Sequence, residues 1–193
     1  LKYRMSQKDG YMESEEALVT WCVGHLITMS YPEAYDEKYK KWSLDTIPFI
    51  PEEFKYEVID SVKKQFHIVS GLLNRQDVET IYVCTDSGRE GEYIYRLVEQ
   101  QAQVGRKERK RVWIDSQTEE EILRGIREAK DLSAYDNLSD AAYLRAKEDY
   151  LMGINFSRVL TLKYSYPVKS YLKADKAVIS VGRVMTCVLG MVV

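Results

Sequence analysis

A short apolar run that ends in an acidic turn constrains this chain more than any other feature. Residues 80–84 read Thr-Ile-Tyr-Val-Cys, and residues 85–92 follow at once as Thr-Asp-Ser-Gly-Arg-Glu-Gly-Glu. The β-branched run predicts a buried strand, and the pattern after the turn predicts a helix over about residues 90–103. A strand that leads through a tight turn into a helix is the opening half of a βαβ unit. The segment therefore indicates an α/β fold.

The rest of the first 132 residues follows the same alternation. The hydrophobic pattern predicts, in chain order, two strands, a helix, a strand and a helix at residues 17–23, 54–59, 60–74, 111–114 and 118–130. Asp60 is the expected cap of the first helix, and Thr118 with Glu121 forms a capping box for the second. The charged run at residues 106–111 is expected to be a solvated loop. This order indicates a βαβ sheet with right-handed crossovers.

Two stretches depart from this alternation. Residues 30–53 hold all but one of the four prolines and many Tyr, Glu and Lys, so we expect a long loop that is too aromatic to be disordered. After residue 133 the pattern predicts a helix over 139–161, a loop rich in Lys and Tyr over 163–177, and an apolar helix from Ser180. One side of the long helix is lined by residues that let another backbone approach closely, namely Ala142, Ala146, Asp149 and Gly153.

Charge and composition narrow the class of protein. With 28 Lys and Arg against 30 Asp and Glu, the net charge is −2, so any affinity for DNA must come from local patches. The longest uncharged apolar run, residues 184–193, is far shorter than the roughly 20 residues that span a bilayer. Three separated cysteines and two histidines argue against structural zinc and favour the reducing cytoplasm. Because the sequence opens without Met and ends in an apolar segment, we expect a piece of a longer protein.

The acidic turn carries the clearest chemical signal. Asp86 follows the predicted strand, and Glu90 and Glu92 open the next helix. Ligands of open α/β sheets bind at the carboxyl ends of strands, and one or two carboxylates together with water suit Mg²⁺. Gly88 and Gly91 leave room for the backbone to turn or to approach a phosphate. In the alternative interpretation, Asp86 caps the helix while Glu90 and Glu92 only complement its dipole.

Several segments match one family in the family's own order. The string Thr85–Glu92 (TDSGREGE) resembles the acidic motif of Toprim domains, and most closely that of topoisomerase III-like type IA DNA topoisomerases. Further similar segments are Val19–Leu26 (VTWCVGHL), Pro32–Pro51, Arg111–Ile114 (RVWI), Arg145–Arg158 (RAKEDYLMGINFSR) and Ser180–Val184 (SVGRV). Because the matches run from about residue 11 to 190, the chain is identified as a member of the type IA topoisomerase family.

The resemblance implies an α/β fold in which a Toprim (Rossmann-like) sheet flanked by helices is followed by the start of a helical domain. Residues 1–132 would form the Toprim domain without its N-terminal strand, and residues 133–193 would begin the helical DNA-gate domain. The family's N-terminal Glu and its nucleophilic Tyr have no counterpart in these residues. Gly88 stands where the family's usual motif carries a second Asp.

The resemblance also implies a reaction. Type IA topoisomerases cut one DNA strand through a tyrosyl-phosphate, pass another strand through the gap and reseal it, with Mg²⁺ and without ATP. It implies Asp86 and Glu90 as Mg²⁺ ligands and Glu90 and Arg89 as catalytic residues. DNA, especially single-stranded DNA, is the implied partner, with no membrane and no ATP, and it would be contacted by Arg183, Arg158 and Ser180. This piece alone is expected to be inactive.

Other interpretations stay open from the sequence. The chain could be a different Toprim enzyme, such as a primase-like polymerase or a nuclease, or a non-catalytic DNA-binding relative. His25 either faces the cleft or packs as a structural residue. Arg145 and Asp149 have the spacing of an ion pair on one helix face. The Lys and Tyr side chains of residues 163–176 either offer charge and stacking faces to single-stranded DNA or belong to an ordinary exposed loop.

Overall fold

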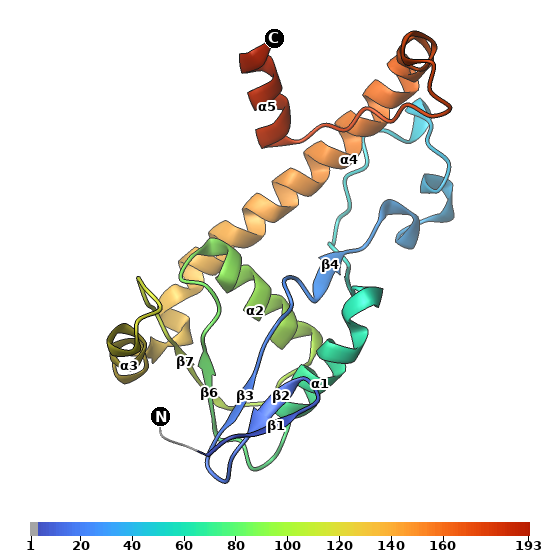
Figure 1. Ribbon diagram of the computed structural model, residues 1–193. Helices are drawn as coiled ribbons and strands as arrows, with labels where there is room; N and C mark the ends of the chain where they lie inside the picture. The colour runs from blue at the N-terminus through green and yellow to red at the C-terminus, as the bar shows by residue number, and fades with distance from the viewer. Residues whose placement is uncertain (1–3) are drawn as a thin grey trace. The chain divides into compact units, whose positions relative to one another are not determined.

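The computed structural model describes residues 4–193, which group into two compact units (Figure 1). The first unit comprises the residues up to Thr28 and Tyr56–Tyr143, and the second comprises Met29–Lys55 and Leu144–Val193. The predicted boundary between residues 132 and 133 stays a prediction. No helix within residues 4–193 is long and apolar enough to cross a membrane.

The centre of the first unit is the predicted βαβ unit. Strand β6 (Thr80–Val83) is followed by helix α2 (Arg89–Gln101) and by strand β7 (Glu108–Arg111), which pairs with β6 in parallel, with Thr80 opposite Glu108 and Val83 opposite Arg111. A short strand β8 (Lys130–Asp131) pairs antiparallel with β7. The prediction of strand, helix and parallel strand is thus confirmed (Figure 1).

The second strand of this pair begins earlier than predicted. Residues 106–111 were expected to be a solvated loop and 111–114 a strand, whereas β7 takes up the charged residues Glu108–Arg111. The charges are tolerated because Arg109 pairs with Glu99 and Arg111 with Glu92, and both glutamates belong to α2. A charged run can therefore form an inner strand when a neighbouring helix supplies the counter-charges.

An antiparallel sheet of three strands precedes this unit: β1 (Ser6–Lys8), β2 (Tyr11–Glu13) and β3 (Leu18–Thr20). The predicted buried strand at residues 17–23 is wrong in length and in burial, since β3 has three residues and Val19 is 49% exposed. A strand that pairs at the edge of a small hairpin sheet keeps one face in water, whatever its apolar content. Gln65 ties this sheet to α1 by donating to the carbonyls of Gly10 and Trp21.

The first unit also contains a second small sheet and two further helices. Strands β4 (Ile27–Met29) and β5 (Tyr56–Val58) form a two-stranded sheet, followed by α1 (Lys63–Leu73) and, later, α3 (Glu119–Arg127). The elements β5, α1 and α3 lie within the predicted ranges, whereas β4 was not predicted. Asp60 is not the cap of α1, because a short 3₁₀ turn precedes the helix and the Asp60 carboxylate pairs with Lys63 instead, at 2.6 Å. Thr118 does cap α3, accepting from the Glu121 N–H.

The core of the first unit lies between the helices and the strands. Its buried side chains are apolar and come from α1, β6, α2 and the residues next to β4 and β7. They include Leu26, Phe66, Val69, Ile81, Val83, Leu97, Val98 and Val112. Burial of such side chains is the main force that holds the unit together. It also fixes the end of β6 against α2, the point where the acidic turn lies.

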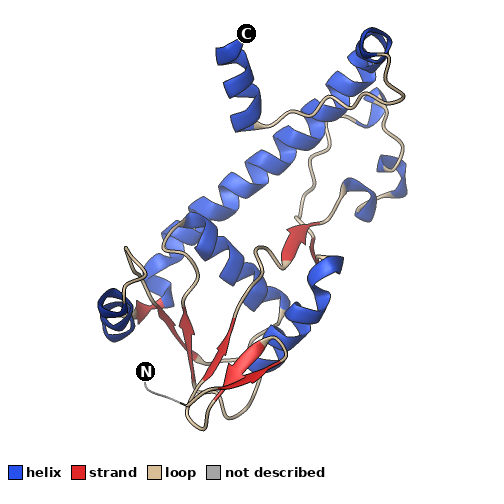
Figure 2. Cartoon of the chain, viewed as in Figure 1, coloured by secondary structure: helices blue, strands red, loops and turns tan. Residues whose placement is uncertain are grey.

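The second unit contains the proline-rich stretch and most of helix α4 (Asp136–Leu172). Residues 30–53 form three short 3₁₀ turns joined by loop (Figure 2). They are ordered around Phe49, which is 2% exposed and packs edge-on against the rings of Tyr35 and Tyr39. The side chain of Asn155 from α4 holds the Phe49 backbone by accepting from its N–H and donating to its carbonyl, at 2.6 and 2.9 Å. The predicted ordered loop is confirmed.

Helix α4 is longer than predicted. It continues to Leu172 through the Lys- and Tyr-rich segment that was expected to be a loop from residue 163, and it contains Pro167. A proline removes one backbone hydrogen bond but does not end a helix whose other residues are good helix formers. The last helix, α5 (Arg183–Val192), starts close to the predicted position.

A short extended segment returns along α4 before α5 begins. The N–H groups of Ile179 and Val181 donate to the hydroxyls of Thr161 and Ser157, at 2.9 and 2.8 Å. A Cβ placed on Gly153 would lie 3.7 Å from the Val181 carbonyl. The predicted close approach of a second backbone to the small-residue side of α4 is confirmed at Gly153.

Candidate functional site

The acidic turn lies where the sequence predicts it, at the carboxyl end of β6. Several backbone contacts hold it: the Gly88 N–H donates to the Asp86 carbonyl, the Thr85 hydroxyl donates to the Gly91 carbonyl, and the Ile114 N–H donates to the Ser87 hydroxyl. The side chain of Asp86 is exposed, and within residues 4–193 its carboxylate makes no hydrogen bond or ion pair. The turn is thus tied by its backbone and leaves one carboxylate free.

The cap of α2 decides between the two interpretations of Asp86. Gly88 is the N-cap of α2, with an extended backbone, and no side chain caps the helix. The interpretation in which Asp86 caps the helix is therefore wrong. A carboxylate that is exposed and not engaged with its own helix is available to a ligand.

The two glycines of the turn serve different purposes. A Cβ at Gly91 would lie 2.1 Å from the Asp86 carbonyl oxygen and 2.6 Å from the Asp86 nitrogen, so only glycine lets the turn pack onto α2. A Cβ at Gly88 would meet nothing within 4 Å. Gly91 is needed for the close approach, whereas the position of Gly88 has room for a side chain.

The side chains of His25 and Glu90 lie together beside the turn. The Nε2 atom of His25 is 2.5 Å from Oε1 of Glu90, and the Glu90 side chain is 70% exposed. His25 follows Gly24, whose φ of +81° favours glycine, and its ring meets the Tyr93 ring edge-on. His25 therefore faces the acidic turn rather than the core, which answers the question that the sequence left open.

The third carboxylate of the string has a different role. Glu92 is 0% exposed, and its two oxygens accept from Nε of Arg96 and Nε of Arg111, each at 2.9 Å. It neither complements the helix dipole at the surface nor faces a ligand with Asp86. Glu92 is the buried counter-charge of two arginines.

Sequence reasoning missed Arg111 as a residue of this site. The motif RVWI marked it only as the start of a strand, yet its guanidinium lies under the acidic turn and donates to the carbonyls of Val83, Thr85 and Asp86. The available signal was weak, because Arg111 ends a charged run and only the residues after it, Val112–Ile114, are apolar. Arg89, the first residue of α2, is exposed and makes no ion pair within the described residues.

The carboxylate oxygens of the turn are ligands of the type that Mg²⁺ prefers. Two hard oxygen donors, Asp86 and Glu90, are exposed at the start of α2, and Mg²⁺ takes one or two carboxylates and keeps several waters. Among residues 4–193, no three His, Cys, Asp or Glu side chains gather in a way that could hold a metal ion. A metal bound here would depend on water and substrate for its other ligands.

The residues predicted to contact DNA occupy different environments. Arg183 pairs with Asp149 through two contacts of 2.8 and 2.9 Å, which raises the pKa of the guanidinium, and Ser180 is exposed just before α5. The expected pair of Arg145 with Asp149 is wrong, because Asp149 reaches across to Arg183 instead. Arg158 is 5% exposed and lies over the Trp42 ring, and burial lowers its pKa.

The Lys- and Tyr-rich end of α4 is open to solvent. Tyr166 and Tyr171 are 82% and 87% exposed. Four lysines of the same stretch are also exposed, namely Lys163, Lys169, Lys173 and Lys176. Exposed aromatic rings beside positive charges suit the bases and phosphates of a single strand.

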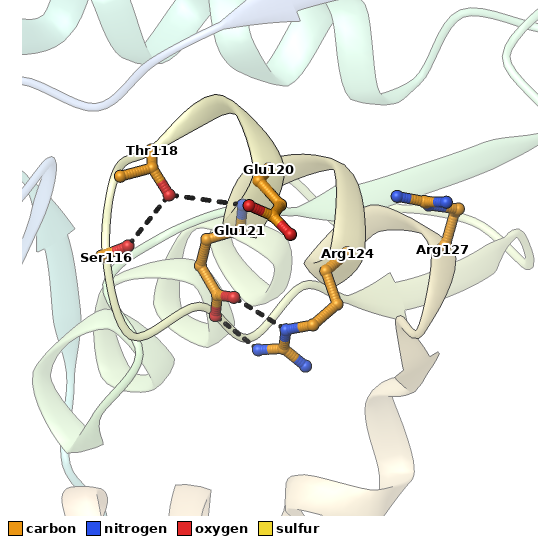
Figure 3. A pocket seen from close by; sticks show the side chains of 6 residues that line it. All are labelled: Ser116, Thr118, Glu120, Glu121, Arg124 and Arg127. Carbon is orange, nitrogen blue, oxygen red and sulfur yellow. Dashed lines mark hydrogen bonds and ion pairs between the residues drawn. The ribbon is translucent and has the colours of Figure 1, made fainter.

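A surface hollow at the start of α3 is not a second site. Six polar side chains line it, namely Ser116, Thr118, Glu120, Glu121, Arg124 and Arg127 (Figure 3). Several of them already satisfy one another: Glu121 pairs with Arg124, which lowers the pKa of the Glu121 carboxyl to about 2, and Thr118 caps the helix. The hollow is the outer side of a helix start.

Comparison with known proteins decides the family. The Toprim domain family matches residues 6–116, and the DNA topoisomerase family matches residues 133–193. The chain belongs to the Toprim family. Its Toprim region includes β6, the acidic turn, α2 and β7, so the predicted Toprim fold with flanking helices and a long helix after it is confirmed.

Individual relatives match most of this chain. It is 40% identical over 184 residues to DNA topoisomerase 3 of Bacillus subtilis (strain 168), a match that covers 95% of this chain and 24% of the relative. It is also 40% identical over 181 residues to DNA topoisomerase 3 of Staphylococcus epidermidis, covering 93% of this chain and 24% of the relative. The predicted resemblance to topoisomerase III-like proteins is confirmed, and the chain spans about a quarter of the length of these relatives.

Proposed function

We propose that these residues form the metal-binding part of a type IA DNA topoisomerase, which cuts and reseals one DNA strand without ATP. The observation that carries the proposal is the acidic turn, whose backbone is tied down while Asp86 stays exposed and unpartnered within residues 4–193. The similarity to proteins named DNA topoisomerase 3 supports the reaction class.

In this proposal the residues of the turn have separate roles. Asp86 and Glu90 would hold Mg²⁺, which when bound supplies positive charge that orients and neutralises the scissile region of the DNA. His25 orients the Glu90 carboxylate, and Arg89 offers its free guanidinium to a phosphate. None of the 15 Tyr residues matches the nucleophile motif of the family, so the tyrosyl-phosphate chemistry would need a residue outside this sequence.

The proposed partner is DNA, with single strands preferred. Tyr166, Tyr171 and the lysines near them offer stacking faces and charge, and Arg183 at the start of α5 offers a phosphate contact. Because the net charge is −2, binding must rest on these local groups and weaken steeply with salt, as counterions are released. The expected cytoplasmic location stays a prediction.

A chimera tests the reaction. This chain would replace the matching quarter of DNA topoisomerase 3 from Bacillus subtilis, and the purified chimera would be incubated with negatively supercoiled plasmid and Mg²⁺. We expect relaxation by the chimera and none by its Asp86→Asn variant. A chimera that folds and binds DNA but does not relax the plasmid would contradict the proposal, as would full activity of the Asp86→Asn variant.

A further inference from the structure

A buried arginine lies directly beneath the acidic turn. Arg111 is the last residue of β7, opposite Val83 in the register of the sheet, and its side chain is 0% exposed. Its Nε donates to Oε2 of Glu92 at 2.9 Å, which balances the charge. The remaining N–H groups of the guanidinium point at backbone oxygens.

Three of these oxygens follow the chain from β6 into the turn. Nη1 donates to the carbonyls of Val83 and Thr85, at 3.1 and 2.6 Å, and Nη2 donates to the carbonyl of Asp86, at 2.5 Å. Nη1 also donates to the carbonyl of the next residue, Val112, at 3.0 Å. The guanidinium is planar and its N–H groups have fixed directions, so one rigid group sets the positions of all three oxygens. Charged donors in a dry environment also make stronger hydrogen bonds than neutral ones.

We propose that Arg111 is a positioning residue of the acidic turn, which fixes the backbone of Thr85 and Asp86 and thereby aims the Asp86 carboxylate outward. Glu92, from the same acidic string, serves this purpose by balancing the buried charge of Arg111. The inference rests on the proposed function only in treating Asp86 as a Mg²⁺ ligand. The hold on the backbone itself does not depend on any metal.

The chain contains a matched control for this proposal. Arg109 lies two residues before Arg111 on β7, and Glu99 lies seven residues after Glu92 on α2, so each shares a face with its counterpart. Arg109 pairs with Glu99 at 2.5 Å and donates to the carbonyls of Lys107 and Gly105. It is the same kind of contact, but it holds residues 104–107 instead of the acidic turn.

Paired substitutions avoid the trivial loss of folding. Removing Arg111 alone would leave the buried Glu92 with Arg96 as its one counter-charge among the described residues, whereas replacing both partners by apolar residues of similar size is often tolerated. The test variant is therefore R111M/E92M, and the control variant is R109M/E99M. Arg96 keeps its contacts with the Leu132 carbonyl and with Asp136 when Glu92 is replaced.

The first measurement is amide hydrogen exchange of the 193-residue chain without metal. In R111M/E92M we expect the amides of residues 85–88 to exchange at least about tenfold faster than in the unchanged chain, as expected when charge-assisted hydrogen bonds are lost. Residues 104–107 should keep their exchange rates in that variant, and the control variant should show the reverse. Equal exchange of residues 85–88 in the test and control variants would overturn the proposal.

Two further readouts separate positioning from simple packing. The R111K variant keeps the positive charge but has a single side-chain nitrogen, so the amides of residues 85–88 should exchange faster in it as well. If these amides exchange as in the unchanged chain, the planar guanidinium of Arg111 is not what holds the turn. Mg²⁺ titration calorimetry should show weaker binding in R111M/E92M than in R109M/E99M, and equal affinity would overturn the link to Asp86. If the unchanged chain binds no Mg²⁺ at all, the metal site of the proposed function fails, while hydrogen exchange still decides the role of Arg111.

Discussion

At the scale of single residues, carboxylates that are close together in the acidic turn lie in different environments. Asp86 lies in solvent without a partner among the described residues, Glu90 meets His25 at the surface, and Glu92 is 0% exposed between two arginines. The difference arises because Glu92 and Tyr93 face the core side of α2, whereas Asp86 precedes the helix. Chemical type alone therefore does not assign a carboxylate to a site.

Asp86→Asn should remove Mg²⁺ binding and leave folding intact. The carboxylate makes no hydrogen bond or ion pair within residues 4–193, so stability should stay within about 0.5 kcal/mol or rise slightly as repulsion from Glu90 is relieved. Calorimetric Mg²⁺ titration and thermal unfolding of both proteins check this. The control is Asp140→Asn, which makes the same charge change at an exposed position of α4. Equal Mg²⁺ affinity in the unchanged chain and in Asp86→Asn would refute the assignment of Asp86.

The two glycines of the turn should respond very differently to alanine. Gly91→Ala places a methyl group 2.1 Å from the Asp86 carbonyl and should cost about 1–3 kcal/mol of unfolding free energy, with the turn displaced. Gly88→Ala has an extended backbone and open space and serves as the control, with little change expected. Denaturant unfolding of both variants checks the difference. A Gly91→Ala variant as stable as Gly88→Ala would mean that the turn does not pack onto α2 as described.

At the scale of elements, α4 and α5 are linked by charge. Arg183 begins α5 and is held by Asp149 of α4 through two contacts, so the guanidinium proposed to meet DNA is already engaged. An exposed ion pair of this kind contributes little to stability and can be exchanged for another anion. If Arg183 meets DNA as proposed, Asp149 would compete with the DNA phosphate for its guanidinium.

Asp149→Asn should therefore tighten DNA binding. Releasing Arg183 should raise the affinity for a single-stranded oligonucleotide about twofold to fivefold at low salt, the range expected for one exposed charge pair. Fluorescence anisotropy with a labelled oligonucleotide measures this. Asp140→Asn makes the same charge change elsewhere on α4, and combining Asp149→Asn with Arg183→Gln should abolish the gain. If Asp140→Asn gives the same gain as Asp149→Asn, net charge and not Arg183 is responsible.

At the scale of the whole molecule, we expect stability at high pH to depend on the buried Tyr93 and the half-buried Tyr143. Burial is the main cause that raises the pKa of Tyr143 from 10.0 to about 12, and burial also raises the pKa of Tyr93, whose ring packs edge-on against Tyr143. The folded chain holds these protons more tightly than the unfolded chain does. The stability gained is therefore full below about pH 10 and is lost as the pH rises towards 12.

Tyr143→Phe should move alkaline unfolding to higher pH. The substitution keeps the ring against Tyr93 and removes one hydroxyl that must ionise, at the cost of its contact with Gln100. Circular dichroism followed from about pH 9 to about pH 12 measures the midpoint of alkaline unfolding in each protein. Tyr171→Phe, at an 87% exposed position, should leave the midpoint unchanged. Identical midpoints in all three proteins would show that Tyr143 is not coupled to unfolding.

Local chemistry in the sequence determined much of this protein. The strand β6, the helix α2, the ordered proline-rich loop and the acidic turn between strand and helix all follow from apolar periodicity, turn residues and β-branched runs, which act over a few neighbouring residues. The family resemblance rests on the same short motifs, and the match of the Toprim family to residues 6–116 confirms it.

Only the tertiary structure decided the roles of charged residues that meet across long distances in the chain. Residues 106–111 looked like a solvated loop because their partners, Glu92 and Glu99, lie on a different element, and charge balance in the core appears only once β7 packs on α2. The pairs of His25 with Glu90 and of Arg183 with Asp149 join residues 65 and 34 positions apart. A charged side chain is stable in the interior only beside its counter-charge, and no local pattern specifies which distant residue that will be.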